Sequence, residues 1–141
     1  MMIHLKKLED EVFTWTNISI HPHRFGGMEF LFGAAEVGHV HTKGIVDIPF
    51  TRPIYDALLA DGLAEAHHWV PNSGWVTFRI RSEQDIEHAL WLMRLSYLRY
   101  VLKSVRDPRT MFERETEKLH LSLRFRSLLE PFVPKTAEQV A

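Results

Sequence analysis

The sequence contains no cysteine, and this absence excludes disulfide bonds, thiolate metal ligands and a cysteine nucleophile. It also lacks any apolar run near the roughly 20 residues that a membrane-spanning helix needs. The N-terminal stretch MMIHLKKLEDEV has no apolar core of about seven or more residues, which a signal peptide would carry. From these absences we expect a cytoplasmic protein that does not enter a membrane.

Neither sign of charge dominates, because 17 basic and 18 acidic residues leave a formal net charge of −1. Such a chain has no overall field to hold a phosphate backbone, which argues against a dedicated nucleic-acid binder but not against a local patch. Its 141 residues suit one domain, and 45% hydrophobic with 25% charged residues is an ordinary globular composition.

Hydrophobic periodicity predicts the secondary structure. Apolar residues at helical spacing predict helices over 3–12, 51–61, 83–104 and 112–129. Runs rich in β-branched and aromatic residues predict strands over 13–20, 28–32, 35–41, 45–48, 67–71 and 74–80. This order predicts an α+β domain, an antiparallel sheet of about five to six strands with helices packed on one face, followed by a C-terminal helical extension.

The long helix is apolar on more than one side. Beside the stripe expected to dock on the sheet, its apolar surface is widened by Trp91, Leu92, Leu95, Leu98 and Leu102. Such a helix needs a second cover, either the C-terminal extension or a partner chain, so a homodimer is one expectation. We divide the chain into a domain over 1–105 and an extension over 106–141, packed on that domain or on a partner.

Histidines are concentrated in one part of the chain. Six of the nine lie between positions 21 and 68: His21, His23, His39, His41, His67 and His68. Residues i and i+2 of a strand point to the same face about 7 Å apart, so His39 and His41 can reach one metal ion. Imidazole suits a divalent metal such as zinc, with Glu36 or Asp47 as carboxylate partner. The alternative is that these histidines hydrogen-bond backbone carbonyls.

Strand register predicts where these histidines point. If the turn after residue 32 has two residues, Phe30 pairs with Val37. His39 and His41 then share a face with the apolar residues, at the mouth of a pocket, and Glu36 lies on the other face out of their reach.

Other residues near this stretch are candidates for ligand binding. Arg24, beside two glycines, can hold a carboxylate or phosphate bidentately, or pair with a surface acid. Adjacent residues of a strand face opposite sides, so at most one of His67 and His68 is expected to join the cluster. Trp69 and Trp75 flank a tight turn and either stack on a ligand or belong to the core.

Positive charge is concentrated after residue 78. The basic residues there are Arg79, Arg81, Arg94, Arg99, Lys103, Arg106 and Arg109. They indicate either a local surface for an anion or nucleic acid, or a solvated helix face.

Several motifs together resemble the luciferase-like domain family of bacterial and fungal proteins over roughly residues 15–100: HRFGG with EF, E-x-G-H-x-H, D-I-P-F, H-H-x-x-P-x-S-G-W and L-S-Y. The resemblance implies that signature positions fall on Arg24, Phe25, Gly26, Glu29, Glu36, His39, His41, Asp47, His68, Ser73, Gly74 and Trp75. It implies no particular reaction, and light emission is not inferred. More distantly, the architecture resembles double-wing α+β domains predicted to bind DNA.

A match to the cupin family is rejected. The spacing from Gly33 to His39-x-His41 fits the opening of the first cupin motif. Ile45 and Val46, however, stand where that motif needs a glutamate, and the helix content is too high for a jelly roll.

The sequence therefore favours a small-ligand-binding domain, with enzymatic activity left open and no catalytic residue assigned. The expected ligand-binding residues are Arg24, His39, His41, Asp47, His68, Ser73 and Trp75. The expected metal ligands are His39, His41 and His68. The alternative is a non-enzymatic interaction module that binds nucleic acid or a protein partner.

Overall fold

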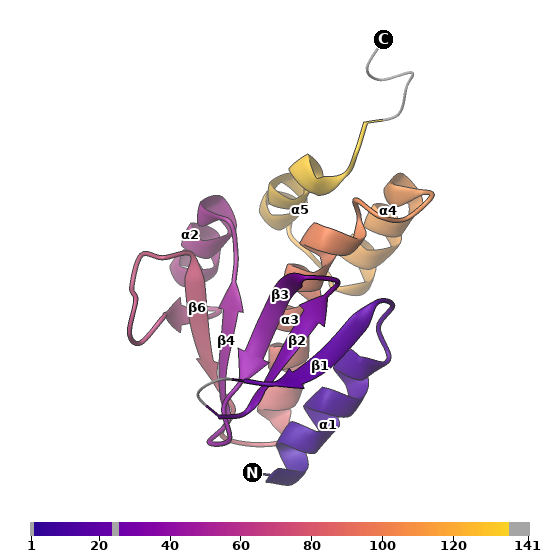
Figure 1. The fold of residues 1–141 in the computed structure, drawn as a ribbon. Helices are drawn as coiled ribbons and strands as arrows, with labels where there is room; N and C mark the ends of the chain where they lie inside the picture. Colours follow the sequence, from indigo (N-terminus) through magenta and orange to yellow (C-terminus); the bar gives the residue numbers. More distant parts are fainter. Residues whose placement is uncertain (1, 24–25, 136–141) are drawn as a thin grey trace. The chain divides into compact units, whose positions relative to one another are not determined.

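A computed structural model describes residues 2–23 and 26–135 (Figure 1). The strands are β1 (Ile18–Pro22), β2 (Met28–Phe32), β3 (Ala35–Val40), β4 (Ile45–Pro49), β5 (Glu65–Ala66) and β6 (Trp75–Arg79). The helices are α1 (Met2–Phe13), α2 (Arg52–Ala60), α3 (Gln84–Val101), α4 (Pro108–Lys118), α5 (Leu123–Leu129) and the 3-10 helix η1 (Glu130–Phe132). None of the helices in these ranges is long and apolar enough to cross a membrane.

All six strands form one antiparallel sheet in the order β1-β2-β3-β4-β6-β5. The first four strands follow one another as a meander, and β6 then inserts between β4 and β5. This arrangement confirms the predicted α+β class with a C-terminal helical extension. The chain divides into two compact units, Met1–Tyr97 and Leu98–Ala141, and the first unit contains the whole sheet.

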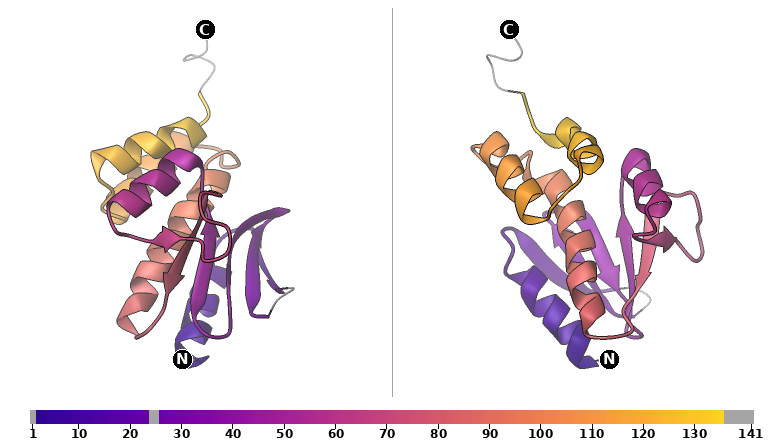
Figure 2. Two further views of the ribbon diagram at one scale, coloured as in Figure 1. Left: turned by 90° about the vertical axis from the view of Figure 1, so that its left-hand side faces the viewer. Right: turned by 180° about the vertical axis from the view of Figure 1, so that it is seen from behind.

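One face of the sheet is apolar, because alternate residues of each strand point the same way. Its buried side chains, at most 2% exposed, include Phe30, Val40, Val46, Ile48 and Val76. Figure 2 shows α3 crossing the sheet, with α1 beside it. Ser96 of α3 donates a hydrogen bond to the carbonyl oxygen of Val37 in β3 at 2.8 Å. The other face carries the polar side chains of the site.

The helix over residues 52–60 forms as predicted. Thr51 stands at its N-cap with extended backbone angles, and Pro53 lies in the first turn, where its missing N–H costs nothing. The apolar stripe that includes Ile54 and Leu58 is fully buried. Asp61 and the following glycine end the helix.

Three predicted elements differ from the structure. The first strand begins at Ile18 instead of residue 13, after Asn17 with a positive φ of 65°. No strand runs over 67–71; β5 is a two-residue strand that ends at Ala66. The final helix is two helices, because His120 adopts a φ of 53° and Ser122 caps a new helix.

Four of the five residues that widen the apolar surface of the long helix are buried. Leu92, Leu95, Leu98 and Leu102 are each at most 1% exposed. Trp91 is half-buried, and a partner chain stays a prediction.

Candidate functional site

A β-bulge in β3 decides which way the histidines point. The predicted two-residue turn is confirmed, but the register then shifts, and Phe30 pairs with Gly38 instead of Val37. One extra residue in a strand reverses the facing of every residue beyond it. His39 therefore pairs with Glu29 and points to the polar face. The predicted position of the histidines on the apolar face is wrong.

Asp47 lies at the centre of the polar face. Cross-strand pairing places it between His39 and Thr77. Its side chain is fully buried, and its Oδ1 accepts a hydrogen bond from Thr77 Oγ1 at 2.6 Å. Burial alone would raise the pKa of this carboxyl, but hydrogen bonds from His39, Thr77 and His41 hold it well below its usual range. The site is built around a buried negative charge.

Four histidine rings converge on the other oxygen of Asp47, Oδ2. Its distances to their Nε2 atoms are 2.9 Å for His41, 3.3 Å for His39, 3.4 Å for His68 and 3.5 Å for His67. A carboxylate oxygen has about two lone-pair sites, so four N–H groups exceed what it can accept. Hydrogen bonding to Asp47 Oδ2 therefore does not account for all four imidazole Nε2 atoms.

Both His67 and His68 reach the cluster, so the prediction that at most one of them joins is wrong. Strand β5 ends at Ala66, and the alternation of a strand no longer applies beyond it. The two rings stack instead, with centroids 4.5 Å apart. Both side chains can therefore approach Asp47 from the same side.

The loop fixes the tautomer of His67. Its Nδ1 accepts hydrogen bonds from the backbone N–H groups of Trp69 at 3.1 Å and Val70 at 3.3 Å. Burial lowers the pKa of His67, which favours the neutral ring. A neutral ring with Nδ1 as acceptor carries its proton on Nε2, which faces Asp47. His67 thus turns an N–H towards the carboxylate, 3.5 Å from Asp47 Oδ2, and is poorly suited to ligate a metal.

His39 bridges two carboxylates. Its Nδ1 lies 3.3 Å from Glu36 Oε1, and its Nε2 lies 3.3 Å from Asp47 Oδ2. Burial lowers its pKa, but the bonds to Asp47 and Glu36 outweigh burial and raise the pKa to about 9. The prediction that Glu36 lies out of reach of the histidines is wrong, because the bulge brings both residues to the same face.

His23 covers one side of the cluster. Its ring stacks on that of His39 with centroids 4.0 Å apart and an interplanar angle of 17°. Burial, followed by the charge of His39, lowers its pKa. His21 lies apart from the cluster and bonds Ser19 Oγ at 2.9 Å.

The other predicted site residues occupy different positions. Trp75 borders the cluster, with its ring centroid 5.4 Å from that of His39. Ser73 is a turn residue whose Oγ accepts from Trp75 N at 3.3 Å. Trp69 is 68% exposed beside His68. Arg24 lies outside the described residues.

The basic residues after position 78 do not form one free cationic face. The guanidinium of Arg94 lies over the rings of Trp15 and Tyr97, 4.9 Å from each centroid. Arg99 is only 7% exposed, and Arg109 pairs with a glutamate at 2.9 Å. The side chains of Arg79 and Arg81 make no ion pair within the described ranges.

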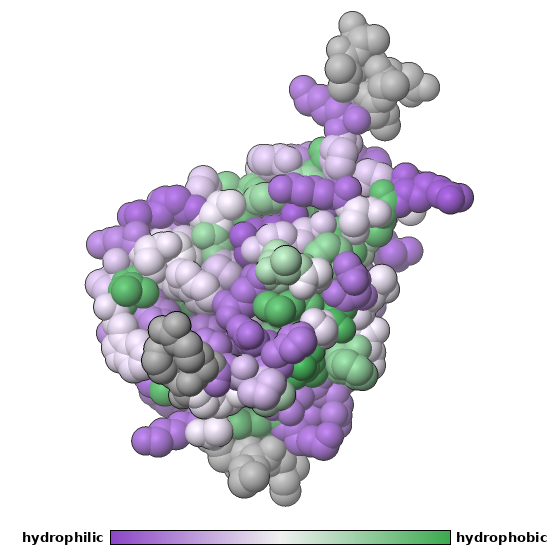
Figure 3. Space-filling model, in the orientation of Figure 1, coloured by the Kyte–Doolittle hydropathy of each residue, from purple (hydrophilic) through white to green (hydrophobic). Residues whose placement is uncertain are grey.

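Two groups in the cluster have metal-ligand spacing around the same carboxylate. One is His39, His41 and Asp47, and the other is Asp47, His67 and His68; in each group the ligand atoms lie within 4.8 Å of one another. The first group offers two imidazoles and a carboxylate, a ligand set for zinc or non-haem iron, whereas in the second group the Nε2 of His67 carries a proton. Figure 3 shows hydrophilic side chains over β3 and β4, on the face turned away from α3. The first group therefore has the donor atoms and the spacing of a cation site.

Sequence reasoning missed Thr77 and expected only one of His67 and His68 in the cluster. Thr77 lies on the same face of β6 as Trp75, and that alternation was visible in the sequence. The hydrogen bond from Thr77 to Asp47 was not visible in the sequence, because the two residues lie 30 positions apart and meet only when β4 pairs with β6. No local signal indicates the role of His67, which depends on where β5 ends.

The fold and the cluster define an α+β domain with a carboxylate-centred histidine site on one face of an antiparallel sheet. Residues 34–96 match the family model described as Luciferase domain, which confirms the resemblance seen in the motifs. The matched segment includes His39, His41, Asp47, His67 and His68. Comparisons with curated proteins and with solved structures found no match.

Proposed function

We propose that this domain binds a divalent transition-metal ion through His39, His41 and Asp47, and that the ion holds a small ligand. The observation that supports it is the convergence of four imidazole Nε2 atoms within 3.5 Å of Asp47 Oδ2. Asp47 Oδ2 cannot accept four hydrogen bonds, so some of the histidine Nε2 atoms are available to coordinate a cation through their lone pairs.

The surrounding residues have the arrangement that supports metal-ligating groups. Glu36 accepts from His39 Nδ1, which would orient the ring and leave Nε2 for the ion. Thr77 holds the Asp47 carboxylate through its other oxygen. Ligation replaces the proton on His39 Nε2, so the ion and the proton compete for this nitrogen.

His68 lies where it can complete or vacate the coordination shell. Its Nε2 is 3.4 Å from Asp47 Oδ2, on the loop after β5. Three protein ligands leave one position of a four-coordinate ion free. His68 can fill that position in the resting protein, and a small ligand can displace it.

Metal content and metal affinity test this proposal. Untagged protein purified without added metal is analysed by elemental analysis, and the metal-free protein is titrated calorimetrically with zinc, iron(II), manganese and cobalt. We expect one ion per chain for at least one of these metals. His39→Ala, His41→Ala and Asp47→Asn are each expected to weaken its binding by at least about 100-fold, and Glu36→Gln by about 10 to 100-fold.

The matched control is His21→Ala, which removes an imidazole from the same sheet face without touching the cluster. It is expected to leave affinity and stoichiometry unchanged. The proposal fails if no metal binds the wild-type chain, or if the cluster variants bind it as the control does.

A further inference from the structure

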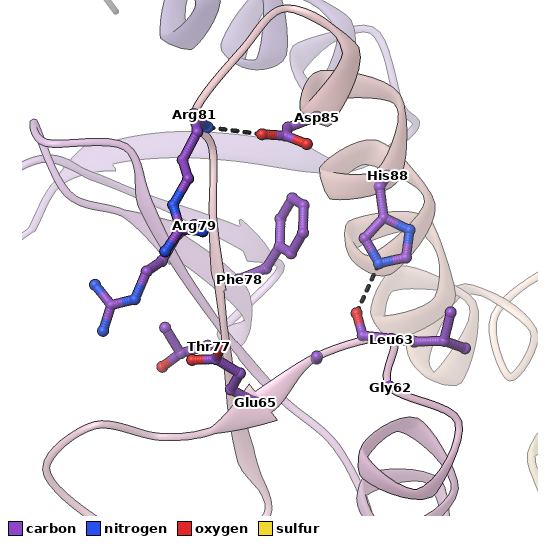
Figure 4. Close-up of a pocket in the computed structure, with 10 residues that line it drawn as sticks. Gly62, Leu63, Glu65, Thr77, Phe78, Arg79, Arg81, Asp85 and His88 are labelled. Atoms are coloured by element: carbon purple, nitrogen blue, oxygen red, sulfur yellow. Dashed lines mark hydrogen bonds between the residues drawn. The ribbon is translucent and has the colours of Figure 1, made fainter.

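A cavity lined by β5, β6 and the start of α3 shares Thr77 with the candidate metal site. It has a volume of about 490 Å³, within the range of small-molecule pockets. It is lined by Gly62, Leu63, Ala64, Glu65, Thr77, Phe78, Arg79, Arg81, Asp85 and His88 (Figure 4). All of these residues belong to the first compact unit. Thr77 contributes to both places, because it lines this pocket and its hydroxyl bonds Asp47.

Two arginine side chains that line this pocket have no anionic partner in the part of the chain that the structure describes. Arg79 is the last residue of β6, and Arg81 follows two residues later, before α3 begins. Figure 4 shows them extending away from Phe78 and His88. Within the described residues, neither guanidinium makes an ion pair or a hydrogen bond. Arginine offers a planar fork of donors that fits a carboxylate or phosphate.

The two acids of the pocket differ in their availability. Asp85 Oδ2 accepts from the backbone N–H groups of Arg81 at 2.7 Å and Ser82 at 3.2 Å, at the start of α3. That carboxylate is occupied by helix capping. Glu65 lies opposite Thr77 in the sheet and makes no ion pair in the described residues. Glu65 is therefore the one acid of the pocket that competes with an incoming anion.

The uncovered edge of β6 adds a backbone donor. Ile80 N donates to Gly44 O on the β4 side at 2.9 Å, so by alternation the N–H of Arg79 points to the opposite edge. Strand β5 pairs with β6 through Glu65 and Ala66, opposite Thr77 and Val76. Arg79 lies beyond this pairing and has no partner residue in β5. The backbone N–H of Arg79 is thus a further donor beside the two arginines that line the pocket.

The opposite wall of the pocket is fixed. His88 Nε2 donates to the carbonyl oxygen of Leu63 at 2.7 Å, and the ring of Phe78 packs edge-on against His88 with centroids 4.7 Å apart. These contacts tie α3 to the segment before β5. This wall of the pocket is therefore formed before a ligand arrives, which lowers the entropy cost of binding.

We propose that this pocket binds the anionic group, a carboxylate or a phosphate, of a small molecule, with Arg79 and Arg81 as its anchors. Its place beside Thr77 makes it the second half of the ligand site at the metal, a role that rests on the proposed function. Anion binding itself does not require the metal.

The experiment uses the full-length protein labelled with nitrogen-15 and follows backbone amide shifts. Inorganic phosphate and malonate are titrated separately at constant ionic strength, first without metal and then with the ion identified in the metal titrations. We expect saturable shifts at Arg79, Thr77 and Glu65. The anion with the lower dissociation constant identifies whether phosphate or carboxylate is the preferred group.

Three substitutions are expected to change the affinity for the anion, two by weakening it and one by strengthening it. Arg79→Gln and Arg81→Gln are each expected to weaken anion binding by about tenfold or more, the loss of one charge-assisted contact. Glu65→Gln is expected to strengthen it, because a competing carboxylate is removed. Arg114→Gln, an exposed arginine of α4, is the control for general loss of positive charge and should change nothing.

The outcomes separate this inference from the metal proposal. Absence of saturable shifts, or equal weakening by Arg79→Gln and Arg114→Gln, overturns the anion pocket whatever the metal titrations give. Anion binding that is lost in Arg79→Gln, in a protein that binds no metal, supports the pocket and refutes its place beside a metal. Tighter anion binding after metal loading supports both.

Discussion

The buried carboxylate of Asp47 is stabilised by its neighbours. Thr77 donates to one oxygen and imidazoles donate to the other. A buried charge without such partners would cost several kcal/mol, so its partners matter more for stability than surface ion pairs do. Glu36 extends the network by one more carboxylate through His39.

The proton shared by His39 makes the stability of the metal-free protein pH-dependent. The pKa of His39 is raised from 6.5 to about 9, so its contribution to stability is fully present below pH 6.5 and is lost as the pH rises through 9. We expect the free energy of unfolding to fall over this window in urea titrations at several pH values. His39→Gln should flatten that fall. An equal slope in both proteins would contradict the assignment.

At the scale of the element, the β3 bulge positions the site. Gly38 pairs with Phe30 at the bulge, on the face where α3 packs. A Cβ at this position would lie 2.8 Å from Met93 Sδ, 3.2 Å from Asp47 O and 3.3 Å from Ile48 Cγ1. A side chain at residue 38 would therefore crowd both the end of Met93 in α3 and the backbone of β4.

Gly38→Ala tests this account of the bulge. The methionine end can move, but the backbone of Asp47 cannot move without disturbing the site. We expect a loss of about 1–3 kcal/mol in unfolding free energy, measured by urea denaturation, and a weaker metal affinity. Unchanged stability together with unchanged metal affinity would show that α3 does not constrain this strand.

At the scale of the molecule, the proposed ion should stabilise the fold. An ion that binds only the folded chain, at 100 times its dissociation constant, adds about 2.7 kcal/mol to the free energy of unfolding. For a chain of this size that corresponds to a rise in Tm of roughly 5–10 °C. Thermal unfolding followed by circular dichroism should show the rise in the wild type and not in Asp47→Asn. A similar rise in that variant would place the ion elsewhere.

Local patterns predicted most of the elements. The helix over residues 52–60 follows from its cap and its apolar stripe, and the hairpin turn follows from glycine at residue 33, whose φ is +59°. These features depend on neighbours in the chain. Failures occurred where the chain left regular structure, as at His120 and after Ala66.

The sequence by itself determined the α+β class, the resemblance to the Luciferase domain and the histidine-rich segment as the place for chemistry. Only the tertiary structure decided how these groups meet. The facing of His39 depends on a bulge in β3, and the bonds of Asp47 to Thr77 and His68 join segments 30 and 21 residues away. Spacing along a strand cannot reveal such contacts, because they arise from packing between distant segments and from one inserted residue that reverses a face.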